Sequence, residues 1–136
     1  DWMCIAGALM DHIARPDRTL PMTLTAWRGS KLSRAQAASL RAGEVVLPPM
    51  FVSASTCRQA AEAFQDVFLV RFCIPTACRH AGLVRGTLEN GEVALLPYTP
   101  LRIMEVGEDD IIRVYVIEDL QAVERTAGMA CRAFPI

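Results

Sequence analysis

Apolar and polar residues alternate over short stretches of the chain, and proline and glycine residues separate these stretches. Residues 22–27 alternate between Pro21 and Gly29, which predicts a strand with one buried face. Residues 67–74 are almost all apolar, which predicts a central strand buried on both faces. About six strands are expected in all, the others at residues 50–53, 92–96, 101–106 and 112–117.

Three segments have the spacing or the end signals of helices. Residues 2–14 carry apolar side chains at helical spacing and predict an opening helix. Ser33 and Gln36 form a capping box that predicts a helix up to Leu40. A second capping box, which begins at Thr56, predicts a helix that runs to Phe64. Helices lead and strands dominate the second half, so an α+β fold is expected.

Length and composition indicate a single folded domain. The chain has 136 residues, of which 52% are hydrophobic and 21% are charged. It opens at Asp1 without a methionine, so we expect one domain over residues 1–136 that is excised from a longer protein. Its net charge is -1 and it has no basic stripe, which argues against general affinity for nucleic acid.

We expect a soluble monomer that does not enter the membrane, because no apolar stretch approaches the length that crosses a bilayer. Cytoplasmic and secreted locations both stay open. No bound metal is expected, because neither His12 nor His80 has a partner at ligand spacing. The five cysteines are expected to be free thiols, with a Cys73–Cys78 disulfide as the alternative in a secreted protein.

The first candidate for chemistry is Trp27-Arg28-Gly29, at the end of the first predicted strand. An arginine beside a glycine that permits close backbone approach suits bidentate binding of a phosphate. A surface arginine next to a turn is the alternative interpretation.

The second candidate is the segment from Phe51 to Thr56. Ser53 and Ser55 are two residues apart, so they share a face if the strand persists, and their hydroxyls can hold a carboxylate or a ribose oxygen. Helix capping explains Ser55 or Thr56 equally well, but it does not explain Ser53.

The third candidate is Glu89-Asn90-Gly91-Glu92, where another strand begins. Period-2 geometry puts Asn90 and Glu92 on one face and Glu89 on the other. A carboxylate at this place can stabilise positive charge that develops on a sugar. The alternative is a polar residue at the start of an edge strand.

These three motifs, in this order, resemble those of the mono-ADP-ribosyltransferases of the Arg-Ser-Glu class, which includes vertebrate ecto-enzymes and bacterial toxins of the cholera and C3 types. The resemblance extends over residues 23–118. It implies a split β-sandwich of two roughly perpendicular sheets with an N-terminal helix. It also implies an enzyme that binds NAD in the cleft between the sheets and transfers ADP-ribose to an acceptor.

The resemblance implies a role for each motif. Arg28 binds the NAD diphosphate, and Ser53 positions NAD and the catalytic Glu92. Glu92 bonds the 2′-hydroxyl of the nicotinamide ribose while the glycosidic bond opens to an oxocarbenium ion, a cation that needs a fixed negative charge. The remaining expected NAD-binding residues are Gly29 beside the phosphates, Trp27 and Phe51 stacked on the aromatic rings, and Ser55 at the strand–helix corner.

The chain departs from the family pattern at Asn90, which stands where arginine-specific members have the first glutamate of Glu-x-Glu. An amide neither acts as a general base nor pairs ionically with arginine, so we expect an acceptor other than arginine. Glu89 is the alternative contact if the loop is rearranged, and residues 82–91 are expected to form a mobile loop that recognises the acceptor.

We expect a protein acceptor, with nucleic acid and small molecules as alternatives. Two further functions stay open at this point: an NAD glycohydrolase that uses water as the acceptor, and an inactive NAD-binding or interaction domain.

Overall fold

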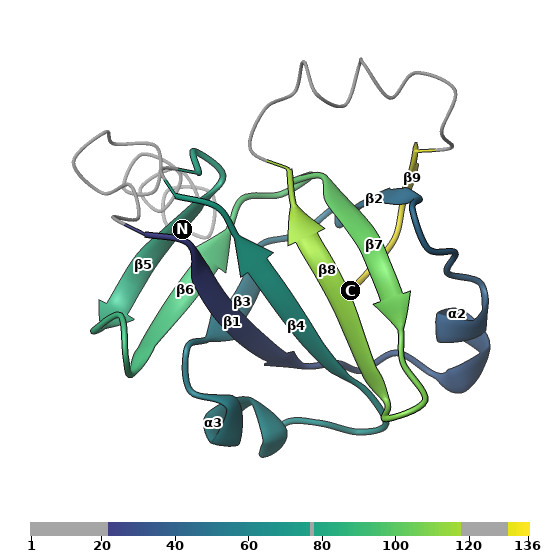
Figure 1. Ribbon diagram of the computed structural model, residues 1–136, viewed down its shortest axis with the longest axis horizontal. Coiled ribbons are helices and arrows are strands. Elements are labelled where there is room, and N and C mark those ends of the chain that lie inside the picture. Colours follow the sequence, from purple (N-terminus) through teal and green to yellow (C-terminus); the bar gives the residue numbers. More distant parts are fainter. Residues whose placement is uncertain (1–21, 77, 118–130) are drawn as a thin grey trace, which may run out of the picture.

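The computed structural model describes residues 22–76, 78–117 and 131–136, so the expected helix at residues 2–14 lies outside the described residues. The described part consists of strands that form a curved sheet, with two short helices (Figure 1). The elements are β1 (Leu24–Gly29), α2 (Arg34–Ala38), β2 (Val45–Leu47), β3 (Val52–Ser55), α3 (Arg58–Glu62), β4 (Leu69–Ile74), β5 (Ala81–Gly86), β6 (Gly91–Leu95), β7 (Leu101–Val106), β8 (Ile111–Val116) and β9 (Cys131–Ala133).

The strands follow the order β5-β6-β3-β1-β4-β8-β7-β2-β9. All pairs are antiparallel except β4 with β8 and β2 with β9. β1 and β3 are joined at a single residue pair, Trp27 with Ser55. This narrow link divides the sheet into a three-stranded part and a six-stranded part, which lie side by side in Figure 1. The α+β class is confirmed, and the narrow link is compatible with the expected split sandwich.

β4 lies at the centre of the strand order, as expected for the apolar stretch at residues 67–74. Val70, Phe72 and Ile74 are fully buried in the main core. Leu69 packs on the other face, in a small cluster beneath α3. The expected burial on both faces is wrong at Arg71, which is exposed where the second face of the strand opens to solvent.

The main core lies on one face of the sheet, because each strand turns alternate apolar side chains to the same side. The last residues of the chain close it, and both Phe134 and Ile136 are buried. Ser30 is buried and holds this end in place, because its hydroxyl donates to the carbonyl oxygen of Ile136 at 3.0 Å. The Ser30 hydroxyl oxygen also accepts from the backbone nitrogen of Leu32, so both the donor and the acceptor of this buried hydroxyl have partners.

One of the two predicted capping boxes is confirmed. Ser33 caps α2 by accepting from the backbone nitrogen of Gln36, whose side chain in turn accepts from the backbone nitrogen of Ser33. The second box is wrong, because the N-cap of α3 is Cys57 and makes no side-chain bond. The hydroxyl of Thr56 is bonded to Gly91 instead, and α3 ends two residues before Phe64.

Three observed strands were not predicted. β2 and β9 have three residues each, too few to display an alternating pattern. β5 occupies residues 82–86 of the segment expected to be a mobile loop at residues 82–91, so that expectation is wrong. Only residues 87–90 lie between β5 and β6, and they form a tight turn.

Two further findings concern the sequence expectations. None of the four described cysteines, Cys57, Cys73, Cys78 and Cys131, is in a disulfide, so the alternative Cys73–Cys78 disulfide is not formed. Within the described ranges, no helix is both long enough and apolar enough to span a membrane.

Because Phe72 is fully buried on the central strand, we expect Phe72→Ala to lower the free energy of unfolding by about 3–5 kcal/mol. Urea denaturation followed by circular dichroism measures this change. Met104→Ala is the control, because the Met104 side chain is 54% exposed and its truncation leaves no cavity. An equal loss in both variants would contradict the assignment of Phe72 to the core.

Candidate active site

A cavity with a volume of about 580 Å³ opens beside the narrow link between β1 and β3. β1, β3 and β6 contribute its walls, and α3 closes one side. Seven of the nine predicted site residues line it: Trp27, Arg28, Gly29, Ser53, Ser55, Asn90 and Glu92. The fold therefore brings together three motifs that are far apart in the sequence.

A short hydrogen bond joins the second and third motifs. The Ser53 hydroxyl donates to Oε1 of Glu92 at 2.6 Å. β3 and β6 are antiparallel with Ser55 opposite Glu92, so Ser53 is the diagonal neighbour of Glu92 on the same face. The Ser53 hydroxyl thus holds a carboxylate, and the bond fixes where that carboxylate points.

Arg28 connects the first motif to the second. Its Nη1 donates to the backbone carbonyl of Ser53 at 2.9 Å, a bond that crosses the gap between β1 and β3. Its Nε is buried and has no hydrogen-bond partner among the described residues. Burial lowers the pKa of the Arg28 guanidinium from its ordinary value, because desolvation penalises the charged form. An anion next to this guanidinium would offset that penalty.

Gly29 is required by a contact within the protein. A Cβ at this position would lie 2.5 Å from the carbonyl oxygen of Ala61 and from the backbone carbon of Phe64. The backbone after β1 therefore lies directly against the end of α3. The close approach at Gly29 is made by the chain itself. Gly29 also lines the cavity, and the expectation that it admits a ligand to the backbone stays a prediction.

Trp27 lines the cavity with cations close to its ring. The guanidinium carbon of Arg58 lies 4.9 Å from the ring centroid, and that of Arg71 lies 5.7 Å from it. These are cation–π distances, so the indole already has charged partners. The expectation that Trp27 stacks on a ligand ring stays a prediction, and such a ligand would share the indole with these arginines.

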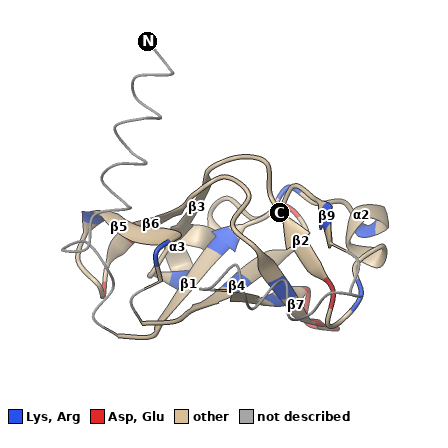
Figure 2. Cartoon of the chain, turned by 90° about the horizontal axis from the view of Figure 1, so that it is seen from above, with Lys and Arg blue, Asp and Glu red and all other residues tan. Residues whose placement is uncertain are grey.

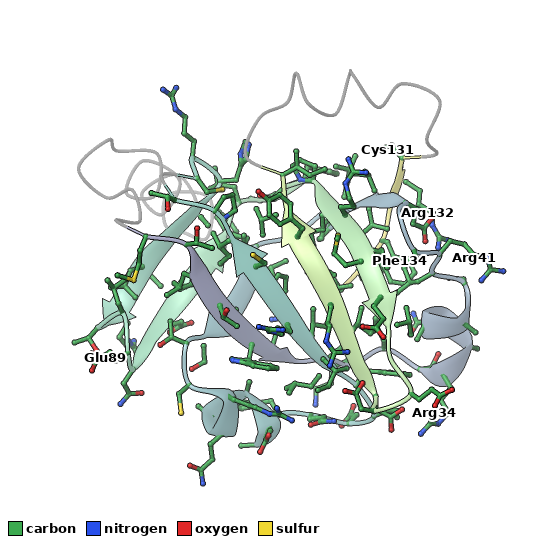
Figure 3. The ribbon with its side chains drawn as sticks, in the orientation of Figure 1. Arg34, Arg41, Glu89, Cys131, Arg132 and Phe134 are labelled. Atoms are coloured by element: carbon green, nitrogen blue, oxygen red, sulfur yellow. The ribbon has the colours of Figure 1, made fainter. Side chains whose placement is uncertain are left out.

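Phe51 and Glu89 are not among the residues that line the cavity. Phe51 precedes β3, and Glu89 lies in the turn between β5 and β6, at the outer edge of the molecule in Figure 3. An aromatic side chain that sequence reasoning missed lines the cavity instead: Phe64, which follows α3 and is 69% exposed. A large apolar side chain left in water beside a cavity is available to a ligand.

The turn that carries Asn90 is held by specific bonds. The backbone nitrogen of Gly91 donates to the Thr56 hydroxyl at 2.8 Å, and the backbone nitrogen of Asn90 donates to the Thr87 hydroxyl at 3.1 Å. Gly86 has a φ of 77°, a conformation that favours glycine. The segment is therefore a defined hairpin beside Glu92.

Positive charge exceeds negative charge among the cavity residues. Arg28, Lys31 and Arg85 line the cavity, and Glu92 is the one carboxylate among the lining residues that the structure describes. Basic positions occur on both β1 and β5 (Figure 2). Lys31 and Arg85 were not expected from the sequence. Across the described ranges, no group of His, Cys, Asp and Glu side chains could hold a metal ion.

Solved structures with the same fold include several bacterial toxins. The structure matches the Vis toxin of Vibrio splendidus with a TM-score of 0.67 at 22% sequence identity, over 85% of this chain and 56% of that chain. It matches the C3larvin toxin of Paenibacillus larvae with a TM-score of 0.60 at 18% identity, over 82% of this chain and 69% of that chain. It matches the Salmonella SpvB domain with a TM-score of 0.60 at 13% identity, over 85% and 71%. The Vis and C3larvin toxins are ADP-ribosyltransferases, and the SpvB structure is that of its ATR domain.

The chain has the ADP-ribosyltransferase fold. It spans little more than half the length of the Vis toxin. No protein-family model matches it, and no curated protein matches it by sequence. Because the sequence identity to these toxins is low, the function of this chain is inferred mainly from the geometry of its cavity.

Gly29→Ala tests the contact that closes the cavity. The new methyl would meet backbone atoms of Ala61 and Phe64, so we expect a loss of about 1–3 kcal/mol in the free energy of unfolding. Gly107→Ala is the matched control, because the nearest atoms there are the tips of the flexible Asp109 and Arg113 side chains. Chemical denaturation compares the two variants, and a Gly29→Ala protein as stable as the control would contradict the close packing of α3 on β1.

Proposed function

We propose that the chain is the catalytic domain of an NAD-dependent mono-ADP-ribosyltransferase. The observation that carries this proposal is the hydrogen bond from Ser53 to Glu92 in a cavity that Arg28 also lines. A carboxylate aimed by a hydroxyl and placed beside a cation is the arrangement that a dinucleotide with a cleavable glycosidic bond requires. The ADP-ribosyltransferase fold supports the same conclusion.

The residues present fit NAD as a substrate. The cavity of about 580 Å³ lies within the usual range for sites that bind small molecules and cofactors. The diphosphate carries two negative charges, and Arg28 offers a buried Nε without a hydrogen-bond partner among the described residues. Lys31 adds a second positive charge to the lining. The exposed ring of Phe64 offers an apolar surface to the nicotinamide or the adenine.

The reaction breaks the bond between the ribose carbon and the nicotinamide nitrogen. Nicotinamide leaves with the bonding electrons, and positive charge develops on the ribose. The acceptor then bonds to that carbon and gives up its proton to solvent. The chain contributes the fixed negative charge of Glu92, and the Ser53 hydroxyl holds that carboxylate in place before the charge develops.

Asn90 is relevant to which type of residue accepts the ADP-ribose. It lines the cavity two residues before Glu92, where it offers an amide and no negative charge. The Vis toxin has been solved with agmatine, a compound that ends in a guanidinium group. In this chain no second carboxylate among the described lining residues is available to pair with a guanidinium, which supports a protein acceptor modified at a residue other than arginine.

Glu92→Gln tests the proposed chemistry. The amide keeps the shape of the side chain and removes its negative charge, so we expect nicotinamide release from NAD to fall about 100-fold or more. NAD affinity should stay within a few-fold of the original value, because Arg28 still binds the diphosphate. Chromatography of the reaction mixture measures nicotinamide, and calorimetry measures NAD binding.

Glu108→Gln is the control for this experiment, because Glu108 is an exposed carboxylate in the turn between β7 and β8. Glu92-dependent release that needs an added acceptor identifies a transferase. Release of equal size without any acceptor would identify an NAD glycohydrolase. NAD binding without release would identify an inactive NAD-binding domain, and unchanged release in Glu92→Gln would contradict the role of Glu92.

Arg28→Lys tests the diphosphate site. Lysine keeps the positive charge but loses the guanidinium fork that reaches the Ser53 carbonyl, so we expect the Kd for NAD to rise about tenfold. Arg102→Lys on β7, away from the lining residues, controls for general effects of an arginine-to-lysine change. A Kd for NAD that does not respond to Arg28→Lys would remove Arg28 from the site.

A further inference from the structure

Arg85 lines the cavity, and it lies within residues 82–91, the segment expected to recognise the acceptor, although the sequence did not single out this side chain. It lies on β5 opposite Glu92, and the pair is in register across the antiparallel ladder. Residues directly opposite in such a ladder have Cα atoms about 4.5–5.5 Å apart. The guanidinium is exposed and has no hydrogen bond or ion pair with the part of the chain that the structure describes.

A β-bulge puts Arg85 on this face. Leu83 pairs with Val93 and Arg85 pairs with Glu92, so Val84 is an extra residue without a partner across the ladder. Regular alternation from Leu83 would put Val84 opposite Glu92 and turn Arg85 to the other face. The bulge reverses this and aims a cation at the cavity, a use of bulges that is common beside active sites.

Arg85 and Arg28 lie on opposite sides of Glu92. In the strand order β5-β6-β3-β1, β6 with Glu92 and β3 lie between β5, which carries Arg85, and β1, which carries Arg28. If Arg28 binds the diphosphate, the reacting ribose lies at Glu92 and Arg85 lies beyond it. Arg85 and Asn90 belong to the same β5–β6 hairpin, and both are exposed, so a second substrate can reach them.

We propose that Arg85 selects the acceptor, and that the acceptor is a peptide segment with a carboxylate side chain next to the modified residue. This inference rests on the proposed function. A guanidinium without a partner in the described chain attracts a carboxylate and repels arginine and lysine side chains. Asn90 beside it supplies no charge to cancel that preference.

An acidic peptide fits better than a nucleic acid. Binding to a phosphate backbone needs a run of cations, whereas Arg28 is assigned to the NAD diphosphate and two other basic groups near the cavity are already in ion pairs. Lys31 pairs with Asp66 at 3.4 Å, and Arg58 pairs with Glu62 at 2.8 Å. The Arg85 guanidinium can therefore bind one carboxylate of the acceptor peptide.

The test uses the full 136-residue chain, NAD and two peptide pools. Both pools carry Ser, Thr, Cys, Asn, Gln or Arg at the centre, flanked by glutamate in one pool and by lysine in the other. Mass spectrometry measures ADP-ribose on each pool, and chromatography measures nicotinamide. We expect the unmodified chain to favour the glutamate pool about fivefold, the size of one favourable ion pair.

The variants assign this preference to one side chain. Arg85→Gln should bring the ratio of the two pools to about one, and Arg85→Glu should invert it. Arg79→Gln removes the same charge from an exposed position outside the cavity lining and should keep the original ratio. Arg85 is exposed, so its replacement leaves the core untouched.

Three results would overturn the inference and leave the proposed function standing. In the first, both pools are modified equally by every variant. In the second, Arg85→Gln keeps the ratio and raises only the KM for NAD, which would make Arg85 part of the NAD site. In the third, an oligonucleotide in the same mixture is modified and neither pool is. Nicotinamide release without any transfer would identify a glycohydrolase, and absence of Glu92-dependent release would overturn the proposed function itself.

Discussion

The site depends on the single residue pair that joins β1 to β3. Had the two strands stayed paired along their length, ladder hydrogen bonds would fill the space between them. They separate beyond this pair, toward Arg28 on β1 and Ser53 on β3, and the Arg28 side chain reaches across the gap to the Ser53 carbonyl. Gly29 then lets α3 lie against β1 and close one side. The cavity is a consequence of this separation, and its polar residues are those that flank the link.

Charge gives the cavity its proposed chemistry. Glu92 is the one carboxylate among the described lining residues, which also include three cations, and the hydroxyl of Ser53 fixes its direction. We propose that two of the cations bind different anions: Arg28 binds the diphosphate of NAD, and Arg85 binds a carboxylate of the acceptor. Glu92 lies between them on β6, so the strand order separates the donor substrate from the acceptor. The strand pairing that stabilises the sheet therefore also determines how Arg28, Glu92 and Arg85 are placed relative to one another.

The sequence predicted the parts of this structure that local patterns encode. The capping box at Ser33 and the apolar stretch of β4 are local signals, and both elements formed as expected. The polar residues of the three motifs stood out because nothing in a strand pattern requires Ser53 or Glu92. The bulge that turns Arg85 into the cavity has no local signal, since it depends on how β5 pairs with β6. From the sequence, the hydroxyl of Thr56 could have capped a helix, but in the folded chain it accepts a hydrogen bond from the backbone nitrogen of Gly91 instead.

The central claim is that NAD lies across this cavity with its diphosphate at Arg28 and its nicotinamide ribose at Glu92. The most direct measurement is a crystal structure of the Glu92→Gln protein with NAD, because this variant should bind the dinucleotide without consuming it. The account predicts phosphate oxygens at the Arg28 guanidinium and the 2′-hydroxyl of the ribose at residue 92. A dinucleotide bound elsewhere, or bound here with its diphosphate away from Arg28, would contradict it.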